Sequence, residues 1–206
     1  MQTTTELVEK AAALAARGGR RILGIAGPPA AGKSTLADRL AEALGPATAV
    51  VVPMDGFHLA RAELARVGRA DRKGAPDTFD VAGYVALLGR LRASGGGTVY
   101  APAFDRSLEE PIAGSIPVPP AVPLVITEGN YLLHDAGEWA SVRPLLDEAW
   151  YLAPDEDLRV RRLVDRHVRH GKEPGAARAW VARSDEANAR LVAPGRHRAD
   201  LVLDIG

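Results

Sequence analysis

The segment Gly27–Ser34 has the residue types and spacing of a loop that binds nucleotide phosphates. It reads Gly27-x-x-x-x-Gly32-Lys33-Ser34. In such a loop the backbone N–H groups surround the phosphate oxygens, the Lys side chain reaches the β- and γ-phosphates, and the Ser hydroxyl ligates Mg²⁺. The residues expected to bind ATP and Mg²⁺ are Gly27, Ala30, Ala31, Gly32, Lys33, Ser34 and Thr35. The alternative is a Gly- and Pro-rich strand-to-helix turn that binds no ligand.

Two acidic residues stand where predicted strands end. Asp55 follows the strand Thr48–Met54, and Glu128 lies at the end of the strand Pro123–Gly129. Ligands of an open parallel sheet bind beyond the carboxyl ends of its strands, so both side chains are expected near the phosphate loop. We predict that Asp55 accepts the proton of an attacking hydroxyl, and that Glu128 holds the metal together with Ser34. The structural alternatives are an Asp-Gly turn for Asp55 and a turn-capping carboxylate for Glu128.

A row of Arg side chains follows one face of the predicted helix Pro154–His170. Arg162, Arg166 and Arg169 recur at helical spacing, opposite an apolar row. We predict a lid around residues 160–175, in which Arg166 is catalytic and Arg162 contacts the nucleotide. The guanidinium groups would spread positive charge over the transferring phosphoryl group. The alternative is an ordinary solvent-exposed helix face.

The elements that must position these residues follow an alternating pattern of apolar, β-rich runs and amphipathic runs. The five predicted strands are Arg21–Gly27, Thr48–Met54, Pro123–Gly129, Ala149–Pro154 and Ala199–Ile205. The predicted helices between them are Ser34–Leu44, Val81–Arg92, Pro154–His170 and Ala176–Leu191. This order predicts an α/β protein with the three-layer P-loop NTPase fold, a five-stranded, mainly parallel sheet and a helical lid. We expect one domain over residues 1–206.

Two long segments between these elements, residues 56–78 and 94–120, are rich in Gly, Pro and Arg. Long irregular segments inside a compact domain are typically binding loops, so residues 55–79 and 98–120 are predicted to bind the phosphate acceptor. The polar side chains expected to contact it are Asp55, His58, Tyr100, Arg106, Asn130 and Asn188. Each has a structural alternative: His58 could satisfy a loop carbonyl, Tyr100 could be a core residue and Asn188 an exposed helix residue.

Composition excludes several classes of protein. The 26 basic and 26 acidic side chains balance, so no overall field attracts nucleic acid or an anionic membrane. There is no Cys, which excludes disulfides and thiolate chemistry. The N-terminal run TTTELVEKAAALAARG predicts an amphipathic helix rather than a signal peptide, and no apolar run is long enough to span a bilayer. We expect a cytoplasmic protein whose partner is a small molecule.

Taken together, the motifs resemble the phosphoribulokinase, uridine kinase and pantothenate kinase group of P-loop kinases. The similar segments follow one another from about Arg20 onward: GIAGPPAAGKST, PMDGFH, RKGAPDTFD, VYAPAFDR, VITEGNYLL, RRLVDRH and APGRHRADLVL. The resemblance implies transfer of a phosphoryl group from ATP to a hydroxyl, with Asp55 as the base, Lys33 and Ser34 at the phosphates and Mg²⁺, Arg166 in the lid, and Arg198 as a further nucleotide contact. It also implies that a homodimer can form.

Two segments differ from the sequences of this group, and the differences concern which molecule accepts the phosphoryl group. Gly74-Ala75 stands where uridine kinases have Asp-His, and Tyr100-Ala101-Pro102 stands where pantothenate kinases have Tyr-Ser-His. The stretch FDRSLEEPIAGSIPV is similar to that of short bacterial sugar-kinase-like members, some described as fructose kinases. We therefore expect a sugar of fructose type, with a uridine-type nucleoside or pantothenate as the alternative.

Two further alternatives remain from the residues. One is a regulatory ATP-binding protein that has no acceptor. The other is a nucleoside monophosphate kinase, whose acceptor phosphate would be bound by Arg66, Arg69, Arg72 and Arg106.

Overall fold

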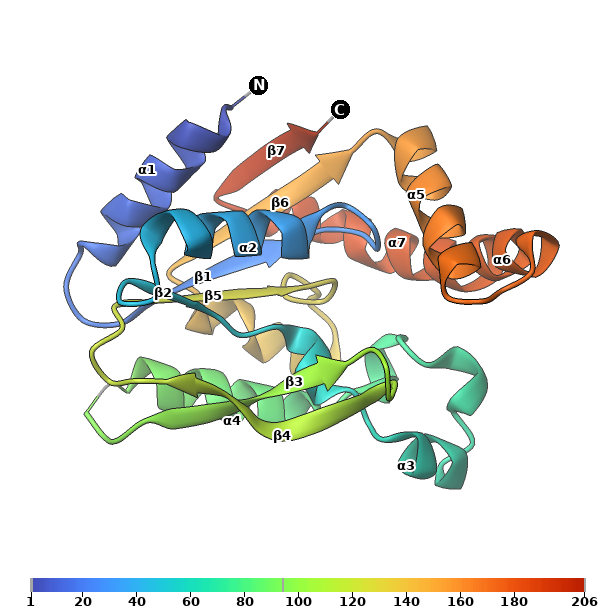
Figure 1. Ribbon diagram of the computed structural model, residues 1–206, viewed down its shortest axis with the longest axis horizontal. Coiled ribbons are helices and arrows are strands. Elements are labelled where there is room, and N and C mark those ends of the chain that lie inside the picture. Colours follow the sequence, from blue (N-terminus) through green and yellow to red (C-terminus); the bar gives the residue numbers. More distant parts are fainter. Residues whose placement is uncertain (1, 94, 206) are drawn as a thin grey trace.

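A five-stranded parallel sheet forms the centre of the computed structural model, which describes residues 2–93 and 95–205 (Figure 1). Its strand order is β2-β5-β1-β6-β7, and each neighbouring pair is parallel. The strands are β1 (Arg21–Ala26), β2 (Ala49–Val51), β5 (Leu124–Gly129), β6 (Glu148–Pro154) and β7 (Leu201–Ile205). The sheet confirms the predicted α/β fold class. β2 is shorter than expected because the chain turns at Pro53 into the 3₁₀ turn Met54–Phe57.

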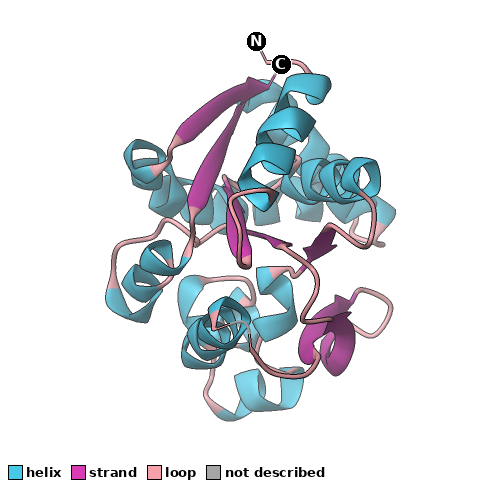
Figure 2. Cartoon of the chain, turned by 90° about the vertical axis from the view of Figure 1, so that its left-hand side faces the viewer, coloured by secondary structure: helices cyan, strands magenta, loops and turns pink. Residues whose placement is uncertain are grey.

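Helices cover both faces of the sheet (Figure 2). Alternate residues of β1 enter two separate cores: Leu23 and Ile25 pack with helices α1 and α2, whereas Ile22 packs with α4. The helices are α1 (Thr4–Ala15), α2 (Lys33–Leu44), α3 (Arg61–Arg66), α4 (Val81–Arg92), α5 (Glu156–Arg169), α6 (Pro174–Trp180) and α7 (Glu186–Val192). Shorter 3₁₀ turns are Met54–Phe57, Ala70–Arg72, Pro76–Thr78, Gly137–Ser141, Arg143–Leu145 and Ala193–Arg198. The result is the three-layer arrangement that the alternating sequence pattern predicts.

An antiparallel hairpin lies apart from the main sheet, where we expected irregular chain. It consists of β3 (Val99–Asp105) and β4 (Glu110–Val118), with an irregular register between Ala101 and Ala103. The expectation of an irregular loop at 94–120 is therefore wrong for most of this segment. Its prolines hide the strand pattern, because Pro normally interrupts a sheet. In a two-stranded hairpin each strand has one unpaired edge, where a residue without an N–H costs no ladder hydrogen bond.

The predicted helix Ala176–Leu191 is interrupted by a π-helical turn, Val181–Asp185, between α6 and α7. Such turns insert an extra residue into a helix and change which side chains share a face. Here Asp185 and Asn188 are both buried on the inner side. Among the described residues, no helix is both long and apolar enough to cross a membrane.

The packing of α2 on the sheet gives a stability prediction. Leu40 is completely buried between α2 and the sheet, in the core that also contains Leu23 and Ile126. Leu40→Ala should lower the free energy of unfolding by about 2–5 kcal/mol, because the substitution removes apolar contacts and leaves a cavity. Urea denaturation followed by circular dichroism measures the change. Glu42→Ala, at an exposed position of the same helix, is the control; equal midpoints for both variants would contradict the assigned core.

Candidate active site

The phosphate loop connects β1 to α2 and has an unusual backbone. Ala30 and Gly32 have positive φ angles of 63° and 90°, a region that costs a non-Gly residue about 1–3 kcal/mol. At Gly27 (φ 150°) a Cβ atom would lie 2.7 Å from the carbonyl oxygen of Leu152 on β6. Gly32 is the N-cap of α2 and has no side chain to cap the first turn. The N–H groups of that turn can therefore bind an anion, which fits the phosphates of a nucleotide.

Lys33, the first residue of α2, points into this loop. Its ammonium group donates hydrogen bonds to the carbonyl oxygen of Pro28 (2.9 Å) and to Oδ1 of Asn130 (2.7 Å). Burial lowers the pKa of Lys33 to about 8, although the negative charges of Glu128 and Asp55 act in the opposite direction. A buried cation held by neutral oxygens would gain from a nearby anion such as a phosphate.

Glu128 lies next to it at the carboxyl end of β5, where only 6% of the residue is exposed. Its Oε1 accepts a hydrogen bond from the Ser34 hydroxyl (3.0 Å). Burial, together with the negative charge of Asp55, raises the pKa of Glu128 to about 7, while Lys33 acts to lower it. A divalent cation would compensate this buried charge, and a carboxylate with a hydroxyl supplies the oxygen ligands that Mg²⁺ prefers.

A metal at this place would need further ligands from the nucleotide. Within residues 2–93 and 95–205, no group of three or more His, Cys, Asp or Glu side chains is arranged to hold a metal ion. Mg²⁺ in nucleotide sites typically takes one or two protein ligands and completes its octahedron with phosphate oxygens and water. Ser34 and Glu128 therefore fit a metal that arrives with the nucleotide.

Asp55 lies across the cleft in the 3₁₀ turn after β2, with a third of its side chain exposed. The nearest cation is Arg106, whose Nη2 lies 3.6 Å from Asp55 Oδ2. His58 Nδ1 lies 4.0 Å from the other carboxylate oxygen, Oδ1. A carboxylate that is partly exposed and not fully engaged can accept a proton from a bound hydroxyl.

The His58 ring is fixed beside this carboxylate. Its Nδ1 lies 2.8 Å from the backbone oxygen of Asp55, and the ring packs between Phe79 (4.0 Å between centroids) and Phe104 (5.0 Å). Burial lowers the pKa of His58, so the ring is neutral at neutral pH. Because a carbonyl can only accept, Nδ1 has the proton and Nε2 is an acceptor. His58 thus satisfies a loop carbonyl and also presents an acceptor for a substrate hydroxyl.

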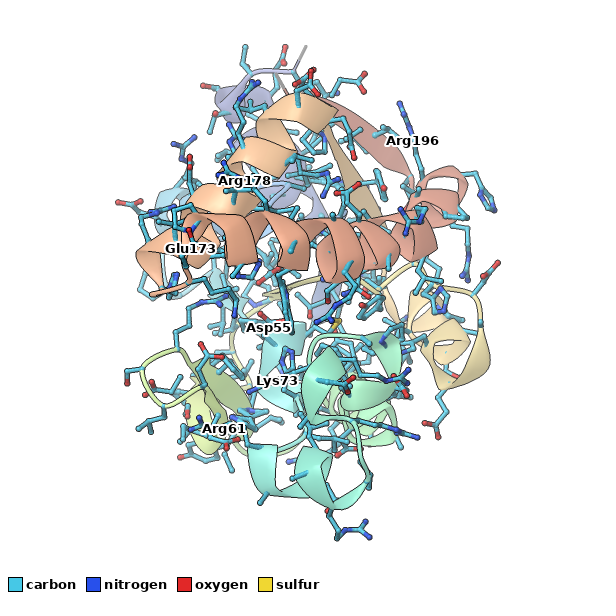
Figure 3. All side chains as sticks on the ribbon, turned by 90° about the vertical axis from the view of Figure 1, so that its right-hand side faces the viewer. Asp55, Arg61, Lys73, Glu173, Arg178 and Arg196 are labelled. Atoms are coloured by element: carbon cyan, nitrogen blue, oxygen red, sulfur yellow. The ribbon has the colours of Figure 1, made fainter. Side chains whose placement is uncertain are left out.

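A single cavity of about 1250 Å³ unites most of the predicted site residues. Of these residues, the ones that line it are Ala30, Ala31, Gly32, Lys33, Ser34, Thr35, Asp55, His58, Arg106, Glu128, Asn130, Arg162, Arg166 and Asn188. Figure 3 shows Asp55 between the helices α5 and α6 on one side and the segment with Lys73 on the other. Residues distant in sequence therefore surround one space large enough for a nucleotide and a small second substrate.

Three predicted residues do not line this cavity. Gly27 lies in the loop itself, where a Cβ atom would collide with the carbonyl oxygen of Leu152, as described above. Tyr100 lies on β3 and is 59% exposed. Arg198 donates a hydrogen bond from Nη1 to the carbonyl oxygen of Leu133 (3.0 Å), so its guanidinium group joins the C-terminal segment to the chain after β5. The arrangement gives Arg198 a structural contact rather than a position at the phosphate loop.

The Arg row of α5 faces the cavity with Arg162, Arg166 and Arg169. The helix is attached at its base by Arg159, a completely buried residue whose guanidinium group pairs with Glu156 and Glu186. Near its other end, Nε2 of His167 lies 2.8 Å from the carboxylate of Asp185 in the π-helical turn. These contacts orient α5 so that its cationic side chains point toward the phosphate loop.

Several cavity residues were not predicted, among them Lys73, Phe104, Trp180 and Asp185. Lys73 had a usable signal, because it is one of four Lys in the chain and belongs to the motif RKGAPDTFD. Asp185 had none, since Asp in a predicted helix is mostly solvent-exposed, whereas here it is buried.

The four Arg residues that could bind an acceptor phosphate differ in their ion pairs and in whether they line the cavity. Arg66 pairs with Glu63, and Arg69 and Arg72 both pair with Asp77. Only Arg106 of that group lines the cavity. The observed arrangement does not favour a nucleoside monophosphate as acceptor.

Comparison with known proteins places this site in a family. Residues 22–206 match the model of the Phosphoribulokinase / Uridine kinase family. A protein of Schizosaccharomyces pombe named "Putative uridine kinase C227.14" is 32% identical over 210 residues, covering 96% of this chain and 88% of that protein. The uncharacterized protein YggC of Escherichia coli is 34% identical, covering 90% and 78%.

A solved structure is similar over its whole length. A protein from Silicibacter sp. TM1040, described as a "putative fructose transport system kinase", has a TM-score of 0.90 at 39% identity, covering 98% of this chain and 100% of that one. The fold, the phosphate loop and the family match agree with one another. The chain belongs to the phosphoribulokinase/uridine kinase family of P-loop kinases.

Proposed function

We propose that this kinase transfers the γ-phosphoryl group of ATP to a hydroxyl of a small metabolite, a sugar of fructose type. The observation that supports the transfer most directly is the position of Asp55, in the same cavity as Lys33, Ser34 and Glu128 and beside Arg106 of the hairpin turn. A binding protein without an acceptor needs the phosphate loop alone. It does not need a partly exposed carboxylate beyond the point where the γ-phosphate would lie.

In the proposed reaction each residue has a separate role. Lys33 and the N–H groups at the start of α2 hold the phosphates, and Asp55 accepts the proton of the acceptor hydroxyl as its oxygen attacks phosphorus. Ser34 and Glu128 would hold Mg²⁺, which when bound neutralises phosphate charge. Arg162 and Arg166 would face the phosphates from the lid and stabilise the charge that develops on the transferred group.

The acceptor half of the cavity fits a compact, hydroxyl-rich molecule. Phe79 and Phe104 provide aromatic surface, His58 Nε2 provides an acceptor, and the Arg106 guanidinium and the Asn188 amide provide donors. Several fixed polar atoms around an aromatic wall are suited to orienting one hydroxyl of a polyol toward a base. The similar structure described as a fructose transport system kinase supports the same class. The relative named as a uridine kinase keeps a nucleoside as the second candidate.

Lys33→Ala should weaken binding of Mg·ATP by about 30- to 100-fold, because two charge-assisted hydrogen bonds to phosphate oxygens are lost. Isothermal titration calorimetry with a non-hydrolysable ATP analogue measures this directly. Lys10→Ala, at an exposed position of α1, is the control and should bind as the wild type does. Equal affinities of the two variants would show that the loop does not bind the phosphates.

Asp55→Asn should reduce the rate of phosphoryl transfer by about 10²- to 10⁴-fold, because the amide cannot accept the proton. Affinity for the ATP analogue should change little, since Asp55 lies on the acceptor side. Asp71→Asn, an exposed acidic residue outside the cavity, is the matched control. Full activity of Asp55→Asn would rule out the assigned base.

The acceptor is identified by ADP release from Mg·ATP in the presence of single candidates: fructose and other sugars, ribonucleosides, pantothenate, glycerate and nucleoside monophosphates. We expect sugars to stimulate release well above the rate without acceptor, and the phosphorylated product to appear by mass spectrometry. Stimulation by a ribonucleoside alone would replace the sugar assignment. Slow release that no acceptor changes, with intact ATP binding, would favour the regulatory alternative.

A further inference from the structure

The N-terminal helix α1 lies outside the part of the chain that matches the family model, yet it lines the cavity. The family match begins at residue 22, whereas α1 ends at Ala15. Gln2, Thr4 and Leu7 nevertheless line the same cavity as the phosphate loop. The role of these side chains is therefore not explained by the motifs that the family match covers.

The start of α1 is held firmly in place. Thr3 accepts a hydrogen bond from the backbone N–H of Glu6, and the Glu6 carboxylate accepts one from the N–H of Thr3 (2.8 Å), which together form a capping box. Leu7, Ala11 and Leu14 are buried in the core beneath α2 and the sheet. Side chains at the beginning of this helix thus have a fixed position relative to the cavity.

The two ends of the cavity differ, and this difference sets the orientation of a bound nucleotide. Asp55 and Arg106 line the end where the hydroxyl must meet the γ-phosphate. The nucleoside must then lie at the opposite end, beyond the start of α2. Figure 1 shows α1 and the tip of β7 on one side of α2, and the β3–β4 hairpin on the other.

The side chains at that opposite end are of two kinds. Leu7, Leu36 and Leu203 provide apolar surface from α1, α2 and β7. The polar side chains there are Gln2, Thr4, Arg39 and Asp204, all largely exposed. A flat base packs favourably on branched aliphatic surface, and an amide such as that of Gln2 can both donate to and accept from a base edge.

We infer that the start of α1, together with Gln2 just before it, forms one wall of the nucleoside subsite, with the Gln2 amide bonded to the base or ribose. This inference rests on the proposed function, since it requires the nucleotide to be oriented toward Asp55. It assigns to α1 a part in recognition of the nucleoside and none in binding the phosphates. Substitutions at the start of α1 should therefore weaken binding of a compound that contains the nucleoside and leave binding of the phosphates alone unchanged.

Two substitutions at exposed positions test the inference without disturbing the core. Gln2→Ala removes the amide, and Thr4→Trp places a bulky ring at the proposed wall. We expect the Kd for Mg·ATP to rise by about 5-fold for Gln2→Ala, the loss of one hydrogen bond, and further for Thr4→Trp. The Kd for Mg·tripolyphosphate, which has no nucleoside, should stay the same. Glu9→Ala, exposed on the same helix and outside the cavity, is the matched control.

The outcomes of this titration are distinct. Unchanged affinity for ATP in both variants would overturn the inference. An equal loss of affinity for ATP and tripolyphosphate would also overturn it, because the helix would then act on the phosphate loop. Failure of the wild type to bind either compound would overturn it together with the nucleotide half of the proposed function. A failure of the acceptor assignment alone leaves these binding constants untouched, since no acceptor is present.

Discussion

The buried pair of Lys33 and Glu128, with the Ser34 hydroxyl bonded to Glu128, is the constraint on which the rest of the site depends. An ammonium and a carboxylate removed from water are stable only with partners at suitable distances. Here those partners come from two adjacent parallel strands and the helix that follows one of them, with Ile25 of β1 opposite Glu128 of β5. The register of these two strands places the carboxylate beside the loop. Any shift of one residue would move Glu128 to the other face of the sheet.

The second constraint is the close approach of the hairpin to the turn that contains Asp55. A Cβ atom on Gly56 would lie 2.4 Å from the carbonyl oxygen of Pro102 in β3, so only Gly fits between them. This contact places the tip of the hairpin, with Phe104 and Arg106, next to the proposed base. The hairpin therefore supports the turn that contains Asp55, and it also supplies part of the proposed acceptor wall.

A chain of contacts connects the acceptor side with α5. Gly74, in the acceptor segment, has a carbonyl oxygen that accepts hydrogen bonds from Tyr131 (2.6 Å) and Asn188 (3.4 Å). Asn188 belongs to α7, which follows the π-helical turn with Asp185, and Asp185 contacts His167 on α5. Asp185 and Asn188 are three residues apart, so their side chains lie on the same inner side of the helix, where both are buried. The helix that contains them therefore contacts both the segment with Gly74 and helix α5.

The fold class and the centre of the site follow from the sequence alone, whereas the outer walls of the cavity do not. Strand and helix periodicity, with Gly27, Gly32 and Lys33 at the junction, are local properties, and the carboxyl ends of parallel strands necessarily meet at one edge. Asp55 and Glu128 could therefore be expected near the phosphate loop before any coordinates, and both line the same cavity. Tyr100 does not line the cavity and is exposed on β3, in a hairpin that the prolines of 94–120 conceal in the sequence. Arg198 belongs to the segment APGRHRADLVL, which resembles the family's C-terminal motif. Its guanidinium group nevertheless donates a hydrogen bond to the carbonyl oxygen of Leu133 and does not line the cavity.

The contributions of Asp185 and α1 to the cavity depend on which elements pack side by side. Those contacts are non-local, and no pattern of neighbouring residues encodes them. The sequence by itself determined the fold class and the phosphate loop, because each depends on short runs of residues. Only the tertiary structure decided which side chains line the cavity around that loop, because separate segments must first pack to enclose that space.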